Sequence, residues 1–469
     1  MSPTLLLILA YSAGLIGLGL WVGRRVETSQ GFFVADRRLS AVLLFSTVLA
    51  ANIGAGSTVG AAGLGYRDGL SAWWWVGSAG VGTLVLAFWI GPRIWRIASE
   101  RGLYTVGDYL EVRYGRPVRA TITALLWIGT PALLAAQLIA MAKILSFVAG
   151  TPHWAGVLIG GIVVTAYFTA GGLLTSAWVN MVQLVVLVAG FAVALPWAWT
   201  VAGGWDAVVA AAPNTEGYLN FWEGGRSGWI YLALLGPNFM VSPGLIQKVY
   251  GAIDERAIRI GLGATAAALF LFALAPPLMG MLARTFDPAL ADQEQALMLV
   301  LTAGLPVLLG ALGLAAVFSA EISSADAILF MLATSLSKDL YKRFVRPTAS
   351  DAQVLKVARA AALSGGALGV LLALVLPSVI GALSIFYALM AVCLFVPVVA
   401  GLYSRLPGVP EALAASGVGV ITLISVELAD LSGSSPLLDP TLLGIGASAV
   451  AFVVVAAWRS SRAAPVKPS

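Results

Sequence analysis

The stretch FSAEISSADA, at residues 318–327, places two acids and three serines inside a long run of apolar residues. On an α-helix, residues at positions i, i+3 and i+4 lie on one face. Ala320, Ser323 and Ser324 have this spacing and would present one backbone carbonyl and two hydroxyl oxygens together. Oxygen ligands suit hard cations, as they do for calcium and magnesium. A site built from neutral oxygens would hold sodium weakly and reversibly, so this stretch predicts part of a sodium site.

Two acids flank this helical face, Glu321 on one side and Asp326 on the other. A charged group inside a membrane is costly to bury, so both are candidates for a functional role. Lys143, in the apolar stretch 118–148, is an available ion-pair partner, so either Lys143 or a backbone group is expected to satisfy Glu321. The alternative for the serines is a local role, because serine in a membrane helix often bonds the carbonyl four residues earlier.

The composition indicates a polytopic helical membrane protein. Hydrophobic residues make up 59% of the 469 residues and charged residues only 10%, whereas a soluble domain carries about 25% charged residues. About 20 apolar residues cross the hydrocarbon core of a bilayer as a helix. The predicted spans, thirteen in all, are residues 4–23, 40–65, 71–95, 118–148, 155–171, 175–202, 228–250, 258–283, 300–336, 356–377, 380–404, 409–428 and 441–459.

The same composition argues against an enzyme or a nucleic-acid-binding protein. The chain has one histidine, His153, and one cysteine, Cys393, so it has no His-rich metal motif and no thiol pair. The net charge of +5 arises from basic residues in loops of one parity. We therefore expect neither enzymatic activity nor a nucleic-acid partner.

The distribution of basic residues predicts the orientation in the membrane. Most lysines and arginines follow odd-numbered spans, and Lys248 and Lys342 are assigned to the loops after the seventh and ninth. Loops after even-numbered spans are neutral or acidic, as at residues 285–295. The positive-inside rule then places the N-terminus outside and the C-terminus in the cytoplasm of a multi-pass protein of the cell (plasma or inner) membrane.

Two spans carry residues that interrupt helices. The second contains the glycine-rich stretch AANIGAGSTVG, and the seventh contains LLGPNFMVSPG, in which Gly236-Pro237 and Pro243-Gly244 are expected to break the helix. Proline removes a backbone donor and clashes with the preceding turn. Irregular backbone at membrane depth is tolerated where it lines a cavity or is buried in protein.

The interrupted spans lie five spans apart, which suggests an internal repeat. Because five is odd, two five-span halves must have opposite orientations, and paired broken spans in an inverted repeat mark the binding site of a transporter. The predicted divisions are 1–39 (a peripheral helix and an inner loop), 40–205 (first repeat), 206–404 (second repeat) and 405–469 (two peripheral helices and a short tail).

The break in the second span would complete the cation site. The carbonyls of Ala50 and Ile53 lose their helical partners there and would bring the set to five neutral oxygens. A solute should bind where the two breaks meet near the middle of the membrane. The predicted lining residues are Asn52, Ser57, Trp75, Gln137, Asn238 and Phe239.

Several stretches resemble the sodium:solute symporter family, which includes transporters for glucose, proline, pantothenate and sialic acid. They are residues 50–66, 105–115, 171–183, 247–261 and 318–344, of which the last is the most specific. The resemblance covers the first eleven spans at least. It implies an all-α fold of the leucine-transporter type, alternating access, and a sodium site at Ala50, Ile53, Ala320, Ser323 and Ser324.

The chain departs from this family at two positions. Many members have aspartate in a W-T-D-x-x-Q segment that is implicated in a second sodium site, whereas this chain reads WVNMVQ with Asn180. Asn180 carries no charge, so one sodium per cycle is expected. Val76 stands near a position where sugar-transporting members have glutamate, which argues against a hexose. Asp326 matches a common S-T-x-D-S form and is assigned a supporting role.

The resulting prediction is a sodium-coupled symporter that functions as a monomer and imports a small polar organic solute. An amino acid, a monocarboxylate and a neutral polar solute all remain open, since no arginine lies deep in a span to clamp a carboxylate. One rival is a proton-coupled transporter of the same fold that uses Asp326 or Glu321, which would follow pH and ignore sodium. Another is a channel, which would conduct without solute coupling.

Overall fold

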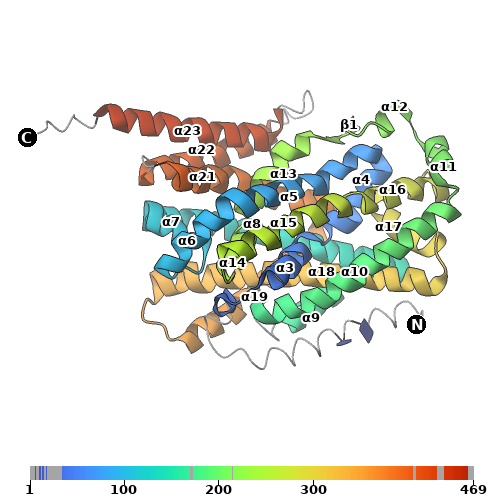
Figure 1. Ribbon diagram of the computed structural model, residues 1–469, viewed down its shortest axis with the longest axis horizontal. Helices are drawn as coiled ribbons and strands as arrows, with labels where there is room; N and C mark the ends of the chain where they lie inside the picture. The colour runs from blue at the N-terminus through green and yellow to red at the C-terminus, as the bar shows by residue number, and fades with distance from the viewer. Residues whose placement is uncertain are drawn as a thin grey trace, which may run out of the picture.

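The computed structural model describes residues 34–168, 173–213, 215–404, 408–429 and 438–462, with six further positions before residue 34. The described chain is almost entirely helical, and most of its long helices run along one direction (Figure 1). The two described strands, β1 (Glu223–Gly224) and β2 (Ser227–Gly228), form a short antiparallel hairpin.

The described helices confirm a multi-pass membrane protein. Ten of them are long and apolar enough to cross a membrane, and the shorter apolar helices Ala41–Asn52 and His153–Thr165 add to these. The predicted first span, residues 4–23, falls largely outside the described residues.

The other predicted spans each correspond to helical elements. These are α3 (Ala41–Asn52) with η2 (Gly56–Gly60) and α4 (Ala61–Asp68); α5 (Trp73–Val85) with η4 (Leu86–Ile90) and α6 (Gly91–Arg101); α8 (Arg116–Ala149); α9 (His153–Phe168); α10 (Leu173–Val201); α13 (Ile230–Val241) with α14 (Pro243–Tyr250); α15 (Glu255–Phe272) with α16 (Ala275–Phe286); α18 (Val307–Thr334) with η6 (Ser335–Val345); α19 (Asp351–Val375); α20 (Val379–Met390) with η7 (Ala391–Phe395) and α21 (Val396–Tyr403); α22 (Val409–Leu428); and α23 (Pro440–Arg462).

The ninth span begins later than predicted. Residues 296–303 form a separate short helix, α17 (Ala296–Ala303), and α18 starts at Val307 rather than at residue 300. Pro306 stands at the N-cap of α18. A residue before proline is disfavoured in the helical region, so the chain turns here instead of continuing the helix of α17.

The breaks in the second and seventh spans are present, with one difference. In the second span, α3 ends at Asn52 and Ile53 is extended, with φ −102° and ψ 98°. In the seventh, α13 ends at Val241 and Ser242 has φ −50° and ψ 123° before Pro243 starts α14. The predicted break at Gly236-Pro237 is wrong, because α13 continues through Pro237. Neighbouring helices and local adjustments re-satisfy the backbone around a proline in a membrane helix.

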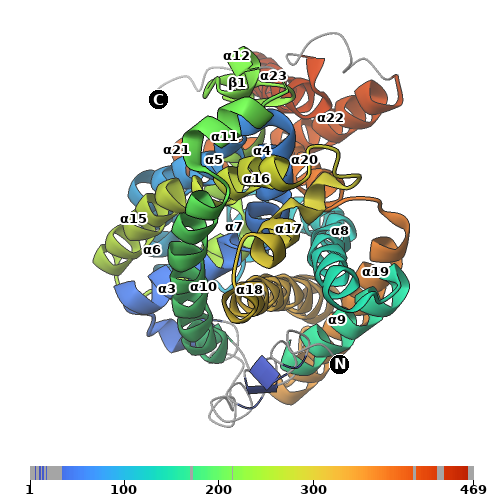
Figure 2. The ribbon, with the colours of Figure 1, turned by 90° about the vertical axis from the view of Figure 1, so that its right-hand side faces the viewer.

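Helix α18 occupies the middle of the bundle. It lies among α8, α9, α10 and α17 when the molecule is viewed along its helices (Figure 2). From Leu314 to Ala325 every residue is buried, which explains why its polar residues need partners within the protein.

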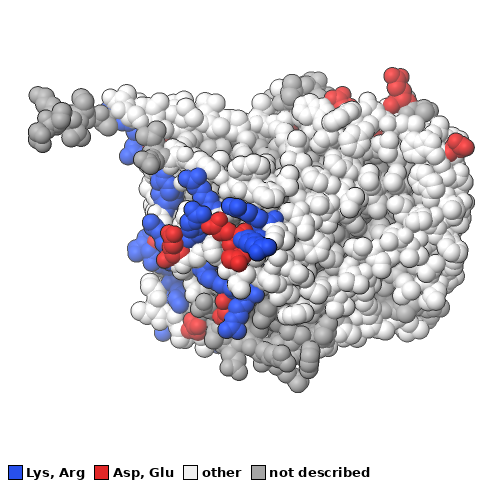
Figure 3. Space-filling model, viewed as in Figure 1, with Lys and Arg blue, Asp and Glu red and all other residues white. Residues whose placement is uncertain are grey.

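Charge separates the two ends of the molecule. Lysines and arginines gather at the end where α6 and α7 (Val106–Tyr114) lie, whereas the opposite end shows a few acids on the same face (Figure 3). One basic group at this end is buried among acids: Arg119 of α8 contacts Asp108, Glu111 and Asp339. Arg119 therefore fastens α8 to α7 and to η6.

Candidate functional site

Ala320, Ser323 and Ser324 of α18 form the predicted cation face, and this face lies against the break in the second span. The hydroxyl of Ser324 lies 3.2 Å from the Ala50 carbonyl and 3.1 Å from the Ile53 carbonyl. Ser323, which precedes Ser324, donates a hydrogen bond of 2.9 Å to Asn180 Oδ1. Ala320 lies one turn earlier on α18 and is buried. The structure thus brings Ser324 into direct contact with two of the other predicted ligands, the carbonyls of Ala50 and Ile53. The remaining two, Ala320 and Ser323, lie on α18 with Ser324.

Asn180 lies at the cation face itself. Its side chain is fully buried on α10 and accepts the hydroxyl proton of Ser323. A neutral amide oxygen at this point adds a polar ligand without adding charge. The electrostatic attraction for cations therefore comes from oxygen dipoles rather than from a carboxylate of α10.

The broken helix is held open by its own side chains and by α8. Ser57 accepts from the Gly54 amide at 2.9 Å, and Gln137 Oε1 accepts from the Ala55 amide at 2.9 Å. Thr58 donates to the Gly54 carbonyl at 2.9 Å. These bonds satisfy backbone groups that a continuous helix would have paired, so the carbonyls of Ala50 and Ile53 face Ser324 instead.

Glycine is required at the centre of this break. A Cβ at Gly54 would lie 2.3 Å from Ser324 Oγ and 2.6 Å from Gln137 Oε1. Any other residue would push the broken helix away from α18 and α8. The close approach of backbone to Ser324 therefore depends on the missing side chain.

Glu321 does not have the partner that the sequence suggested. Lys143 forms ion pairs with Asp292 and Glu294 instead. Glu321 accepts a 2.8 Å hydrogen bond from Thr58, and its other oxygen, Oε2, has no partner among the described residues. The prediction failed because Asp292 and Glu294 belong to the short connection between α16 and α17, where sequence spacing does not predict proximity to α8.

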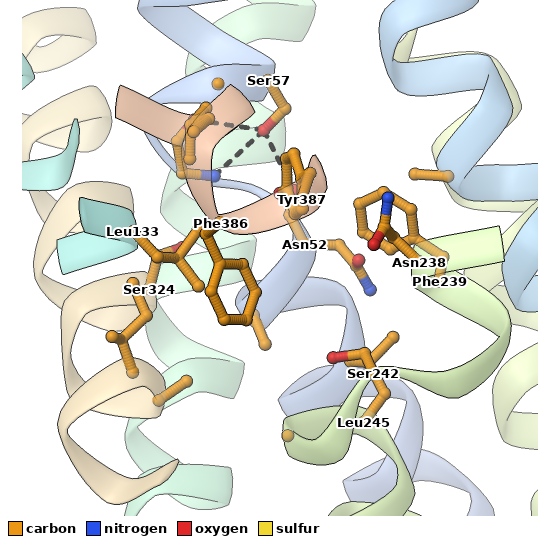
Figure 4. A pocket seen from close by; sticks show the side chains of 18 of the residues that line it. Asn52, Ser57, Leu133, Asn238, Phe239, Ser242, Leu245, Ser324, Phe386 and Tyr387 are labelled. Atoms are coloured by element: carbon orange, nitrogen blue, oxygen red, sulfur yellow. Dashed lines mark hydrogen bonds between the residues drawn. The ribbon is translucent and has the colours of Figure 1, made fainter. Parts of the chain in front are cut away.

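A cavity of about 100 Å³ lies between the two breaks. All six predicted lining residues border it: Asn52, Ser57, Trp75, Gln137, Asn238 and Phe239. Val76 and Ser324 also border it, so the cavity reaches the cation face. Figure 4 shows Ser242 beside Asn52 and Asn238, with Phe386 and Tyr387 from the eleventh span completing the wall. The predicted lining omitted Ser242, although it lies at the break before Pro243, and it omitted Phe386 and Tyr387 because nothing in their apolar span indicated a role.

Each of three amide side chains that border the cavity has one end bonded to the backbone. Asn52 and Asn238 donate from Nδ2 to the carbonyls of Val48 and Leu234, at 2.8 and 2.9 Å. Each therefore directs its acceptor oxygen elsewhere, and Asn238 Oδ1 is buried without a partner among the described residues. Gln137 has the opposite arrangement, because its oxygen is used by Ala55. The cavity is thus bordered by three amide side chains, each of which has one end bonded to the backbone.

The position of Lys248 is the main difference between the predicted site and the structure. It belongs to α14 rather than to an inner loop, is 3% exposed, and borders the cavity. Asp326, 7% exposed, acts on it electrostatically from α18. The predicted span 228–250 already contained Lys248, so an intramembrane cation was visible in the sequence.

Paired broken helices, a cavity between them and oxygen ligands beside it define a secondary transporter of the inverted-repeat type. The family model for the sodium:solute symporter family matches residues 32–419, and the chain belongs to this family.

Known proteins resemble the chain along most of its length. It is 27% identical to the sodium/pantothenate symporter of Escherichia coli (strain K12), over 95% of each chain. It is also 27% identical to the human sodium/iodide cotransporter over 71% of this chain, where it spans 55% of the relative's length.

Solved structures confirm a fold of the leucine-transporter type. A Na+-coupled sialic acid symporter in a substrate-bound outward-open state superposes with a TM-score of 0.81, at 17% identity over 98% of both chains. MhsT in complex with L-phenylalanine superposes with a TM-score of 0.57, at 12% identity over 89% of this chain and 98% of the other.

Proposed function

We propose that this chain imports a small polar organic solute together with one sodium ion per cycle by alternating access. Sodium-coupled symport of a small solute is the activity of its family. The observation that carries the proposal for these residues is the contact of the Ser324 hydroxyl with the carbonyls of Ala50 and Ile53.

Sodium would act at the joint between the broken helix and α18. Its ligands are Ala50, Ile53, Ala320, Ser323 and Ser324, which lie on two different helices. The Ser324 hydroxyl can rotate its proton away from the carbonyls and turn its oxygen to the ion. An ion shared by both helices would hold them together, and its loss would free them to move.

The solute would bind in the adjoining cavity. Gln137 contacts the Ala55 amide, and the cavity also reaches Ser324. Solute binding and sodium binding would therefore both stabilise one arrangement of the break, which is the thermodynamic requirement for coupling.

Asn180 supports a single sodium ion per cycle. It occupies the position beside Ser323 where a carboxylate would add charge, and it supplies an amide oxygen instead. The orientation proposed from the basic loops, with the N-terminus outside and the C-terminus in the cytoplasm, agrees with the gathering of lysines and arginines at one end (Figure 3). The functional unit is proposed to be a monomer.

The first experiment measures sodium-dependent thermal stabilisation of the purified full chain and sodium-dependent uptake in proteoliposomes. Ser323→Ala and Ser324→Ala should each weaken the apparent sodium affinity at least about tenfold, because each removes one oxygen ligand worth about 1.4 kcal/mol or more. Ser337→Ala is the matched control, since Ser337 is buried in the same continuous helix but bonds the Ala333 carbonyl at 2.6 Å. Unchanged sodium affinity in both site variants would contradict the proposed ligands.

One observation keeps proton coupling as a second candidate. Glu321 is fully buried, and its Oε2 has no partner among the described residues. A proton carrier would give uptake that follows the pH gradient without sodium and is lost in Glu321→Gln. The sodium proposal expects the reverse: uptake that requires sodium at every pH.

A further inference from the structure

A buried lysine borders the solute cavity without a close partner. The ammonium group of Lys248 makes no hydrogen bond or ion pair within the described part of the chain, although the residue is only 3% exposed. Asp326 acts on it electrostatically from α18. Lys143, a second buried lysine that lies on α8, instead lies against two carboxylates.

A buried cation without a paired anion is energetically unfavourable. Intramembrane charges pair with one another or line substrate pathways, and Lys248 lines the cavity. An anion that enters from the solute pathway would supply the missing partner. A carboxylate fits, since an ammonium group donates well to its oxygens.

We propose that Lys248 anchors a carboxylate of the transported solute, which makes the substrate an organic acid. This inference rests on the proposed function, and it names the substrate class of the same cavity. The absence of a deep arginine suggested that the protein has no dedicated group to bind a carboxylate. This inference replaces that expectation.

The other groups that border the cavity indicate what the rest of the solute must be like. Asn52 and Asn238 border the cavity with their amide groups, so the solute is expected to carry a polar group away from its carboxylate. Phe239 and Tyr387, whose ring centroids lie 5.7 Å apart, supply an apolar wall. A cavity of about 100 Å³ corresponds to roughly seven to ten water-sized units. A short hydroxy acid or amino acid has this size and this pattern of groups.

The experiment uses matched pairs of acids and the amides in which the carboxylate is replaced by a neutral carboxamide. The full chain is purified and its thermal stabilisation in sodium is titrated with lactate and lactamide, propionate and propionamide, glycine and glycinamide, and proline and prolinamide. At least one acid should stabilise the protein, and its amide should bind at least about 30-fold more weakly, as expected for the loss of a charged hydrogen-bonded pair.

Three variants test the role of Lys248 in binding the carboxylate. Lys248→Gln should weaken binding of the acid at least about 30-fold, whereas Lys248→Arg, which keeps the charge, should stay within about fivefold. Lys143→Gln is the control for removal of a buried lysine, and it should still prefer the acid to the amide. Folding is checked by size-exclusion profile and by stabilisation with sodium alone.

The outcomes separate this inference from the proposed function. Equal binding of acids and amides, binding of no acid in the panel, or unchanged acid affinity in Lys248→Gln would each overturn the anchoring role. Lys248 would then act only inside the protein, opposite Asp326. If sodium alone still stabilises the chain in those cases, the symporter proposal stands; absence of any sodium effect would contradict that proposal instead.

Discussion

At the scale of single residues, the site depends on groups that are placed by close packing rather than by charge. Ser324 reaches the carbonyls of Ala50 and Ile53 because Gly54 has no side chain in the way. Gln137 approaches the same backbone from α8. The cation face is therefore sensitive to volume changes as small as one methyl group.

Gly54→Ala tests this dependence. The added Cβ would lie 2.3 Å from Ser324 Oγ, so we expect the break to shift and the apparent sodium affinity to fall at least about tenfold. Sodium-dependent thermal stabilisation measures the effect. Gly446→Ala in α23 is the control, because a Cβ there meets nothing within 4 Å. A sodium affinity within twofold of the unmodified chain would show that the close contact is not needed.

At the scale of elements, ion pairs at the basic end fasten the short helix α7 to the bundle. Glu111 of α7 contacts Arg119 of α8 at 2.9 Å and also pairs with Arg343 of η6. Partial burial acts to raise the pKa of the Glu111 carboxyl, but hydrogen bonds from Arg343 and Arg119 bring that pKa below its ordinary value. A carboxyl with a depressed pKa stabilises the folded state above its unfolded pKa, and this contribution is lost as the pH falls through the folded value.

Glu111→Gln should therefore lower the free energy of unfolding by about 1 to 2 kcal/mol near neutral pH. The difference from the unmodified chain should shrink as the pH drops below about 4.3, the ordinary pKa of glutamate. Thermal unfolding followed across pH measures both effects. Glu255→Gln is the control, since its pair with Arg96 is largely exposed and exposed pairs contribute little. A constant difference at all pH values would show that the Glu111 charge is not involved.

At the scale of the whole molecule, the two proposed sites lie side by side and would prefer opposite charges. The ligands proposed for sodium are neutral, and the cavity beside them is bordered by Lys248. One sodium ion and one monocarboxylate anion carry no net charge together, so their joint transfer would not be driven by the membrane potential. This consequence links the stoichiometry proposed from Asn180 to the substrate proposed from Lys248.

Charge movement during transport tests this combination. Proteoliposomes with a sodium gradient should take up a monocarboxylate at a rate that a potassium diffusion potential of either sign changes less than about twofold. The control is a net-neutral zwitterion such as proline, whose transport with one sodium should respond to the potential. Strong dependence of monocarboxylate uptake on the potential would indicate a second sodium ion and would contradict the role given to Asn180.

The local parts of the site were predictable from the sequence because they depend on spacing within one helix. Hydropathy predicted the spans, and the glycine and proline signals predicted the breaks after Asn52 and before Pro243. Helical periodicity placed Ala320, Ser323 and Ser324 on one face. The break in the second span predicted Ala50 and Ile53 as their partners, the resemblance implied the same five residues, and Ser324 contacts both carbonyls.

Only the tertiary structure decided the partners of the buried charges. Thr58 and Glu321 are 263 residues apart in the chain, and Lys143 and Asp292 are 149 apart. No spacing rule reaches over such separations, and several carboxylates were equally available to one lysine. The position of Lys248 was decided in the same way, because the packing of α14 against α18 determines that its charge meets a cavity rather than water.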